Sequence, residues 1–468
     1  MKKLILLGVT ISFTMASIAQ ETENITEGET ERFKTENSGF LPIDLATALK
    51  LARAQNSDIA LARETVKQAT AQLKQKKYLL IPDLSFGASI HHTDGPLQET
   101  GGSILDVSRS SSHFGAGSGA VGAGSPTVPG LSLTVNLADA YFEPLAARQN
   151  QAAVIAAGDA VHNNLLLEVA QAYLGLVGPQ AHVAVAEENV QNASELAQYT
   201  RDFAASGEGL HSDAQRAEVQ RLISTGNLEA TRGNLVAAGA ELARLLHLEA
   251  SVELQPVDKD VASILLINPV RSLHELVATA LKSRPEIKQS LALVNRAEQR
   301  IKQSKYSPFV PNIALSASAG GFGGGTGSNF GDPDGRTDLN ALVYWRFKNF
   351  GLGEKERIKE RRSILAQSKH SREGLIDQII AEVKLAHSQV NSHQKQIAIA
   401  EAAVKSAQSS FVLNRSRIFE RQGLPIEMLQ ALQSLASARQ YYVNTVTAFN
   451  QAQYRLYTSI GQAPPNPN

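Results

Sequence analysis

Two hydrophobic periods alternate along this chain of 468 residues. In residues 45–82, apolar side chains recur at the spacing of an amphipathic helix. The period then changes to two, and residues 84–91 alternate apolar and polar side chains. The same alternation recurs in three later segments, residues 131–137, 313–319 and 339–347. The pattern predicts helices joined to four strands, each with one apolar face.

The first helical segment appears a second time. Adding 228 to Leu45 and Tyr78 gives Leu273 and Tyr306, and eight positions agree in this way without a gap. Both copies then reach a proline and an alternating strand. Each copy also contains a break, at Asn56-Ser57-Asp58 in the first and at Ser283 to Pro285 in the second, which we expect to cap the next helix.

Long helical tracts follow both pairs of strands. The first covers residues 140–206 and returns as a helix over 211–249; the second covers 351–421 and returns over 426–460. An offset of 214 relates the two, so the whole molecule reads as one duplicated unit. At about 1.5 Å per residue, such a tract reaches roughly 100 Å, which exceeds a globular domain.

Glycine and proline mark the expected interruptions. Residues 93–130 and 320–337 are rich in Gly and Ser, and we expect each segment to be a surface loop that joins two strands. Gly175, Gly178 and Pro179 lie in the middle of the first long tract, where we expect a kink or a short break.

The composition limits the class of protein. Residues 1–19 combine Lys2 and Lys3, an apolar run too short to span a bilayer and a small-residue cleavage pattern, which predicts a secretory signal. The chain has no cysteine, and its 45 basic and 45 acidic residues argue against nucleic acid as a partner. Motifs for catalysis, metal binding or a cofactor are missing, so we expect a protein that is not an enzyme.

We divide the chain into six parts. They are a signal peptide (1–19), a flexible leader (20–42), a first structural repeat (43–249), a linker (250–271), a second repeat (272–461) and a C-terminal tail (462–468).

The strands fit two environments. One-sided apolar strands are ordinary in soluble domains, but in an exported chain they also fit an outer-membrane barrel. Aromatic residues gather where strands meet helices, among them Tyr78, Tyr306, Tyr344 and Trp345, either as plain packing or as membrane-interface anchors. Four strands cannot close a barrel, and open edges are not tolerated in lipid. A membrane form must therefore pool the strands of several chains.

The chain resembles the TolC-like outer-membrane efflux proteins from about residue 43 to 460. The resemblance rests on the two short helical segments, on the Gln-Leu-Lys…Tyr…Pro run into a strand, and on residues 423–438. It implies a mixed α and β fold: a homotrimer whose twelve pooled strands form a β-barrel in the outer membrane, continued by a periplasmic α-helical barrel. It also implies docking to a periplasmic adaptor that belongs to an inner-membrane pump.

The resemblance assigns candidate sites to the turns between the long helices. Gly209-Leu210 and Gly423-Leu424 fall on the hairpin tips that meet the adaptor, although a glycine there also suits turn formation. The residues expected at the periplasmic constriction are Asp213, Glu427, Gln430 and Arg417. The two acids equally suit helix N-termini, and Gln430 stands where some members carry a further acid. Arg417, with Arg201 and Arg415, could bridge helices at the mouth or form surface salt bridges.

Three functional interpretations remain. The leading one is a passive outer-membrane exit duct for an efflux system. The second, with the same fold, is an exit for proteins in type I secretion. The third is a soluble periplasmic coiled-coil scaffold or adaptor, which the helices fit and the four alternating strands do not.

Overall fold

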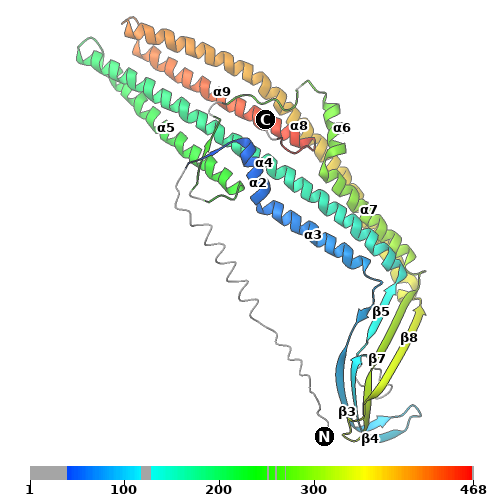
Figure 1. The fold of residues 1–468 in the computed structure, drawn as a ribbon. Coiled ribbons are helices and arrows are strands. Elements are labelled where there is room, and N and C mark those ends of the chain that lie inside the picture. The colour runs from blue at the N-terminus through cyan, green and yellow to red at the C-terminus, as the bar shows by residue number, and fades with distance from the viewer. Residues whose placement is uncertain (1–39, 118–127, 250–251, 259–260, 269, 466–468) are drawn as a thin grey trace.

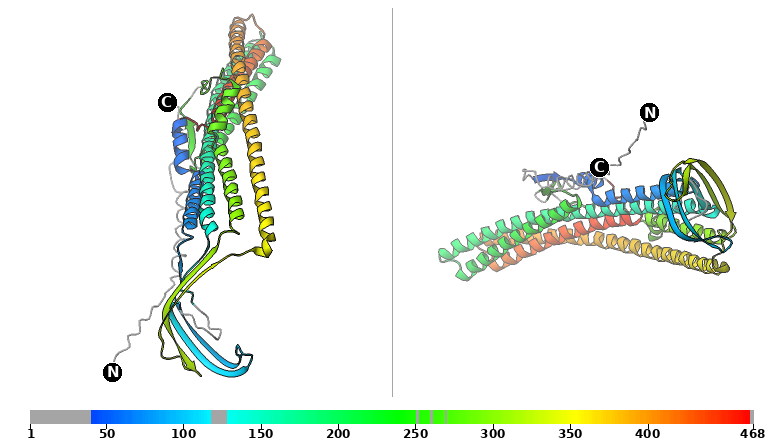
Figure 2. Two further views of the ribbon diagram at one scale, coloured as in Figure 1. Left: turned by 90° about the vertical axis from the view of Figure 1, so that its right-hand side faces the viewer. Right: turned by 90° about the horizontal axis from the view of Figure 1, so that it is seen from below.

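The computed structural model describes residues 40–117, 128–249, 252–258, 261–268 and 270–465. The molecule is elongated, with long helices at one end and a curved sheet at the other (Figures 1 and 2). The expected signal peptide (1–19) lies outside the described residues. None of the described helices is long and apolar enough to cross a bilayer.

The helices of the first half surround one long helix. In chain order they are α2 (Leu45–Gln55), α3 (Ser57–Lys77), α4 (Leu137–Ala205) and α5 (His211–Leu245). Helix α4 runs from the sheet to the far tip, where α5 turns back, and α3 covers the half of α4 nearer the sheet (Figure 1). Two shorter helices thus lie along one long helix.

The second half has the same order. Its helices are α6 (Leu273–Ser283), α7 (Pro285–Tyr306), α8 (Leu352–Phe419) and α9 (Pro425–Ser459), and a short 3-10 turn (Lys348–Gly351) precedes α8. The long helices α4 and α8 have 69 and 68 residues, and α5 and α9 both have 35. These lengths agree with a duplicated unit, which remains a prediction.

Of the two helices that follow the predicted breaks, α3 and α7, only α3 begins with the expected cap. Asn56 caps α3, because its side chain accepts a hydrogen bond from the Asp58 N–H (2.8 Å). Pro285 is the first residue of α7, as predicted, but the cap residue there is Arg284, which makes no side-chain capping bond. Ser283 does not cap, because its hydroxyl instead donates to the carbonyls of Thr279 and Ile460.

Helix α4 contains no break. The expected short break at Gly175, Gly178 and Pro179 is wrong, because α4 is one helix through Pro179; a kink there stays a prediction. A Cβ on Gly178 would lie 3.1 Å from Oγ1 of Thr447 in α9, so this glycine permits close packing of two helices. Proline removes one backbone hydrogen bond, and packing on neighbouring helices outweighs that loss.

The large sheet has six strands, which lie along four antiparallel lines that are called strand courses here. Its strands are β2 (Asp83–Leu84), β3 (Gly87–Gln98), β4 (Ile104–Ala116), β5 (Leu131–Asn136), β7 (Asn312–Thr326) and β8 (Asp334–Tyr344). Strand β7 pairs with β5 over one half and with β4 over the other, so β4 and β5 lie in line. Strands β2 and β3 line up in the same way against β5 and β4.

Where the structure describes them, the two predicted Gly-rich loops are largely strand. Strand β4 and the end of β3 lie inside residues 93–130, while the second loop shrinks to residues 327–333. The reason is close approach of neighbouring strands. A Cβ on Gly320 would lie 2.3 Å from the Phe114 carbonyl oxygen, and one on Gly324 would lie 2.2 Å from that of Ser110.

The leader and the linker also contain structure. Phe40–Ile43 forms β1 and pairs in parallel with β6, Glu253–Pro256, so the end of the predicted flexible leader is a strand. The linker packs on α9 through two buried amides. Asn450 accepts from the Ile264 N–H (2.7 Å), and Gln453 bonds both the N–H (2.9 Å) and the C=O (3.2 Å) of Ile267.

The buried core is divided among separate clusters along the helices. One cluster joins α2, β6 and the end of α5 to the middle of α4. A second cluster joins α6 and α9 to α8. A third cluster lies near the tips, between α4, α5, α8 and α9. The two hairpins are therefore held together along much of their length, and the tips have a core of their own.

Candidate functional site

The sheet has one apolar and exposed face. Leu84 is 64% exposed, Phe86 80% and Leu339 84%. In the antiparallel ladder Leu84 pairs with Leu131, and Ala317 with both Leu131 and Leu339, so these four side chains share one face. A soluble monomer rarely exposes so large an apolar surface, whereas lipid would cover it.

The opposite face of the sheet is polar. Ser89 pairs with His113, and their side chains are 2.8 Å apart. Further along the same face, Ser318 pairs with Asp338, whose carboxylate accepts a hydrogen bond from Arg336 (3.0 Å). The strands therefore separate an apolar side from a hydrophilic side, as the strands of a water-filled barrel do.

The four aromatic residues expected at the membrane interface lie where the sheet meets the helices. Tyr78 ends α3, Tyr306 ends α7, Tyr344 ends β8, and Trp345 follows it. Trp345 is 55% exposed, and its indole N–H donates to the Phe309 carbonyl (3.2 Å). The geometry of Trp345 suits an interface between lipid and water, where a ring needs one polar partner.

Both hairpin tips lie at the end farthest from the sheet (Figure 1). Leu210 and Leu424 each stand just before the returning helix, and are 67% and 61% exposed. Their position leaves both leucines open to a partner.

The two tip glycines lie in the turns, as expected, but their backbone is not left-handed. The left-handed backbone lies at Gly207 (φ 79°) and Arg421 (φ 62°), and not at Gly209 or Gly423. A Cβ on Gly209 would lie 2.5 Å from the Phe203 ring. A glycine is therefore favoured at each position because the turn packs closely against the preceding helix.

The residues expected at the constriction lie on either side of the two tips, Asp213 in the first hairpin and the other three in the second. Glu427 lies in the first turn of α9, 3.3 Å from a guanidinium nitrogen of Arg417 in α8. Asp213 lies in the first turn of α5, 3.3 Å from Arg216. Gln430 is exposed. Both acids thus occupy helix N-termini and also have cationic partners.

Several ion pairs join separate helices near the tips. Arg201 of α4 contacts Glu218 of α5 (3.0 Å), and Arg415 of α8 contacts Glu195 of α4 (2.7 Å). The sequence pattern did not indicate a further ion pair, which joins Arg421 and Glu208 (2.7 Å).

The pairs Arg415–Glu195 and Arg421–Glu208 each join one hairpin to the other, and the Arg421–Glu208 pair lies at the tips themselves. The pairing partners lie more than 200 residues apart, so no local spacing could have indicated them.

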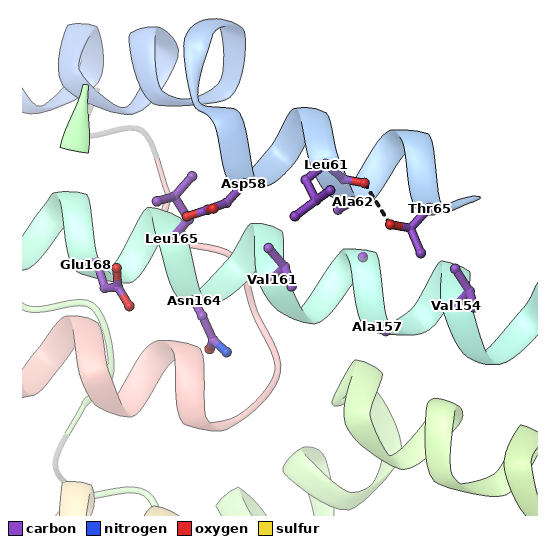
Figure 3. A pocket seen from close by; sticks show the side chains of 11 residues that line it. Asp58, Leu61, Ala62, Thr65, Val154, Ala157, Val161, Asn164, Leu165 and Glu168 are labelled. Atoms are coloured by element: carbon purple, nitrogen blue, oxygen red, sulfur yellow. Dashed lines mark hydrogen bonds between the residues drawn. The ribbon is translucent and has the colours of Figure 1, made fainter. Parts of the chain in front are cut away.

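A groove of 470 Å³ lies between α3 and α4 (Figure 3). Its wall is mainly apolar, including Leu61 from α3 and Val161 from α4, and two acids, Asp58 and Glu168, lie at one end. The groove is distant from the tips. No group of three or more His, Asp or Glu among the described residues could hold a metal ion.

One partly buried acid links the helices where they enter the sheet. Burial raises the pKa of Glu143, but hydrogen bonds from Arg300 and Gln303 outweigh burial, so the pKa is lowered below 4.5. Nearby, the Asn136 side chain caps α4 and donates to the Val310 carbonyl (3.1 Å). These contacts fix the helices α4 and α7 at the top of the sheet.

The family comparison addresses the second half of the chain. Residues 276–462 match the model of the outer membrane efflux protein family. No curated protein sequence matches the chain. The predicted resemblance to TolC-like outer-membrane efflux proteins is confirmed.

Solved structures extend the likeness to both halves. The outer-membrane channel OprN is 18% identical, with a TM-score of 0.74 over 90% of this chain and 91% of its own. VceC, an outer membrane protein of Vibrio cholerae, is 16% identical, with a TM-score of 0.72 over 90% and 96%. The MtrE outer membrane channel of Neisseria gonorrhoeae is 18% identical, with a TM-score of 0.71 over 90% and 89%. The chain therefore has the fold of these outer-membrane channels, as the sequence predicted.

Proposed function

We propose that the chain is the outer-membrane exit channel of a tripartite efflux or secretion system. The observation that carries this proposal is the sheet, with an exposed apolar face and a polar face, continued directly by helices of 69 and 68 residues. The apolar face lies in lipid, the polar face lines the pore, and the helices extend into the periplasm. A periplasmic scaffold would have no use for the apolar face.

The channel is a homotrimer in this proposal. Among the described residues, β3 and β8 each pair with a neighbour on one side only. A free strand edge in lipid leaves backbone N–H and C=O groups without partners, which costs several kcal/mol for each group. Pairing β8 of one protomer with β3 of the next, three times over, closes a barrel of twelve strand courses.

The partners are a periplasmic adaptor and, through it, an inner-membrane pump. The exposed leucines Leu210 and Leu424 lie at the periplasmic end, farthest from the membrane, where an adaptor would dock. Asp213 and Glu427, with Arg417 and Gln430, line the constriction that the adaptor opens. The duct itself is passive and carries out no reaction.

Native mass and fractionation test this proposal together. Protein extracted from outer membranes in mild detergent should have about three times the mass of the mature chain, after correction for bound detergent. Release with osmotic-shock fluid, or a monomer in detergent, would refute the channel and favour the scaffold. Efflux and type I protein secretion are separated by the deletion phenotype: sensitivity to toxic compounds, or loss of a secreted protein.

A further inference from the structure

A pocket with an apolar part and a basic rim lies between the end of α7 and the start of α8. It has a volume of 450 Å³ and is called here the α7–α8 pocket. Its apolar lining includes Phe309, Phe347 and Ile358. Its basic lining consists of Lys305, Lys355, Lys359 and Arg362.

The bases of the α7–α8 pocket outnumber its acids. The only carboxylate in the lining is that of Glu354, which is 6% exposed and accepts a hydrogen bond from the backbone N–H of Lys348 (3.2 Å). Lys359 pairs with Glu356 (2.7 Å) on the exposed helix surface, where such pairs contribute little. The rim therefore presents a net positive charge, although the whole chain is balanced.

The α7–α8 pocket lies at the level where a bilayer would end. Leu339 and Val343 lie on the apolar face of β8, and the chain continues from that strand into Trp345 and Phe347, both more than half exposed. Phe309 is 76% exposed beside them. Aromatic rings at the end of an apolar band, followed by basic side chains, are typical of the headgroup region.

We propose that the α7–α8 pocket binds an anionic glycerophospholipid of the inner leaflet. The phosphate contacts the basic rim, and the upper part of an acyl chain covers Phe309, Phe347 and Ile358. The leaflet follows from the proposed function, on which this inference rests, because the pocket is on the helical, periplasmic side of the sheet.

The single tryptophan supplies the test, because Trp345 contacts Phe309 of the α7–α8 pocket. The full-length protein is reconstituted into phosphatidylcholine vesicles that contain increasing amounts of either brominated phosphatidylglycerol or brominated phosphatidylcholine, present in both leaflets. Bromine quenches tryptophan at short range. We expect half-maximal quenching at a mole fraction of phosphatidylglycerol at least about fivefold lower, since each basic residue near an anionic surface contributes roughly that factor.

Two variants locate the effect. The triple variant Lys355→Gln, Lys359→Gln, Arg362→Gln should bring the two quenching curves together. A matched control, Lys384→Gln with Lys395→Gln and Lys405→Gln, removes the same charge from the distant part of α8 and should keep the preference. In the wild type, high salt should also reduce the preference, because it screens exposed charges; this check does not depend on the variants folding.

The outcomes separate the two proposals. Equal quenching by both lipids in the wild type overturns the lipid site, and is expected if a neighbouring copy of the chain covers the pocket. A preference that persists in the triple variant also overturns it, by placing the charge effect elsewhere. Absence of quenching by either lipid overturns the lipid site alone, because it places Trp345 away from lipid; the native mass in detergent and the fractionation test the channel separately.

Discussion

The ion pairs between the two hairpins should control opening of the periplasmic mouth. Glu195 of α4 contacts Arg415 of α8, and Glu208 contacts Arg421 at the tips, both at 2.7 Å. The double variant Glu195→Gln, Glu208→Gln removes both charges, keeps the side-chain shapes and leaves the arginines in place. If these pairs hold the hairpins together, the open state should become more populated.

The expected magnitude follows from exposure. The side chains of the two pairs are 41–65% exposed, and exposed pairs contribute about 0.2–1 kcal/mol each. Loss of both pairs is therefore worth at most about 2 kcal/mol, a shift of at most about 30-fold in a two-state equilibrium. The arginines also lie over Phe419 and Phe203 at 5.5 and 5.8 Å, contacts that the variant retains.

Single-channel recording of the purified protein in planar bilayers measures this shift. The double variant should be open more often at low salt, and the difference should shrink at high salt as the wild-type pairs are screened. Glu241→Gln with Glu356→Gln is the matched control, because their pairs with Arg244 and Lys359 (both 2.7 Å) each lie within one helix. If the double variant and the control behave alike, these pairs do not hold the mouth.

Three further changes probe the mouth, the linker and the sheet junction. Asp213→Ala with Glu427→Ala should lower cation preference or raise conductance, measured from reversal potentials across a salt gradient; unchanged values would remove both acids from the constriction. Gln453→Leu should cost about 2–4 kcal/mol of stability in denaturant unfolding, because it leaves two buried backbone groups unpaired, and a loss below 0.5 kcal/mol would contradict this. The lowered pKa of Glu143 means that its carboxylate stabilises the fold above pH 4.5 and that this contribution is lost as the pH falls. Glu143→Gln should therefore lower the Tm at pH 7 and match the wild type at acid pH; an equal loss at both would refute the charge effect.

Local periodicity predicted the helices well. The short helices, the long tracts and the tip turns all begin or end within a few residues of the expected positions, because a helix is stabilised by contacts between residues three or four apart. The order of helix and strand, and with it the channel fold, could be predicted from the same pattern. The expected break at Pro179 failed because packing on α9 outweighs one lost hydrogen bond.

The glycine-rich segments failed for a different reason. Glycine is typical of loops in a single sequence, and nothing local indicates that a neighbouring strand will pass within 2.3 Å of an added Cβ, as it does at Gly320. The short strand β1 was equally invisible, since its partner β6 follows more than 200 residues later. In both cases the deciding contact is distant in the sequence.

The sequence by itself determined which segments are helices and which are strands with an apolar face, because those properties depend on the spacing of side chains along one segment. Only the tertiary structure decided how far the strands extend, which residue carries the left-handed backbone at each tip, and which charges pair. Arg421 is an example of both the left-handed backbone and the charge pairing. It has a positive φ, and it pairs with Glu208 of the other hairpin. Hydrogen bonds and ion pairs between distant segments form only when packing has brought the segments together, so a local pattern cannot contain them.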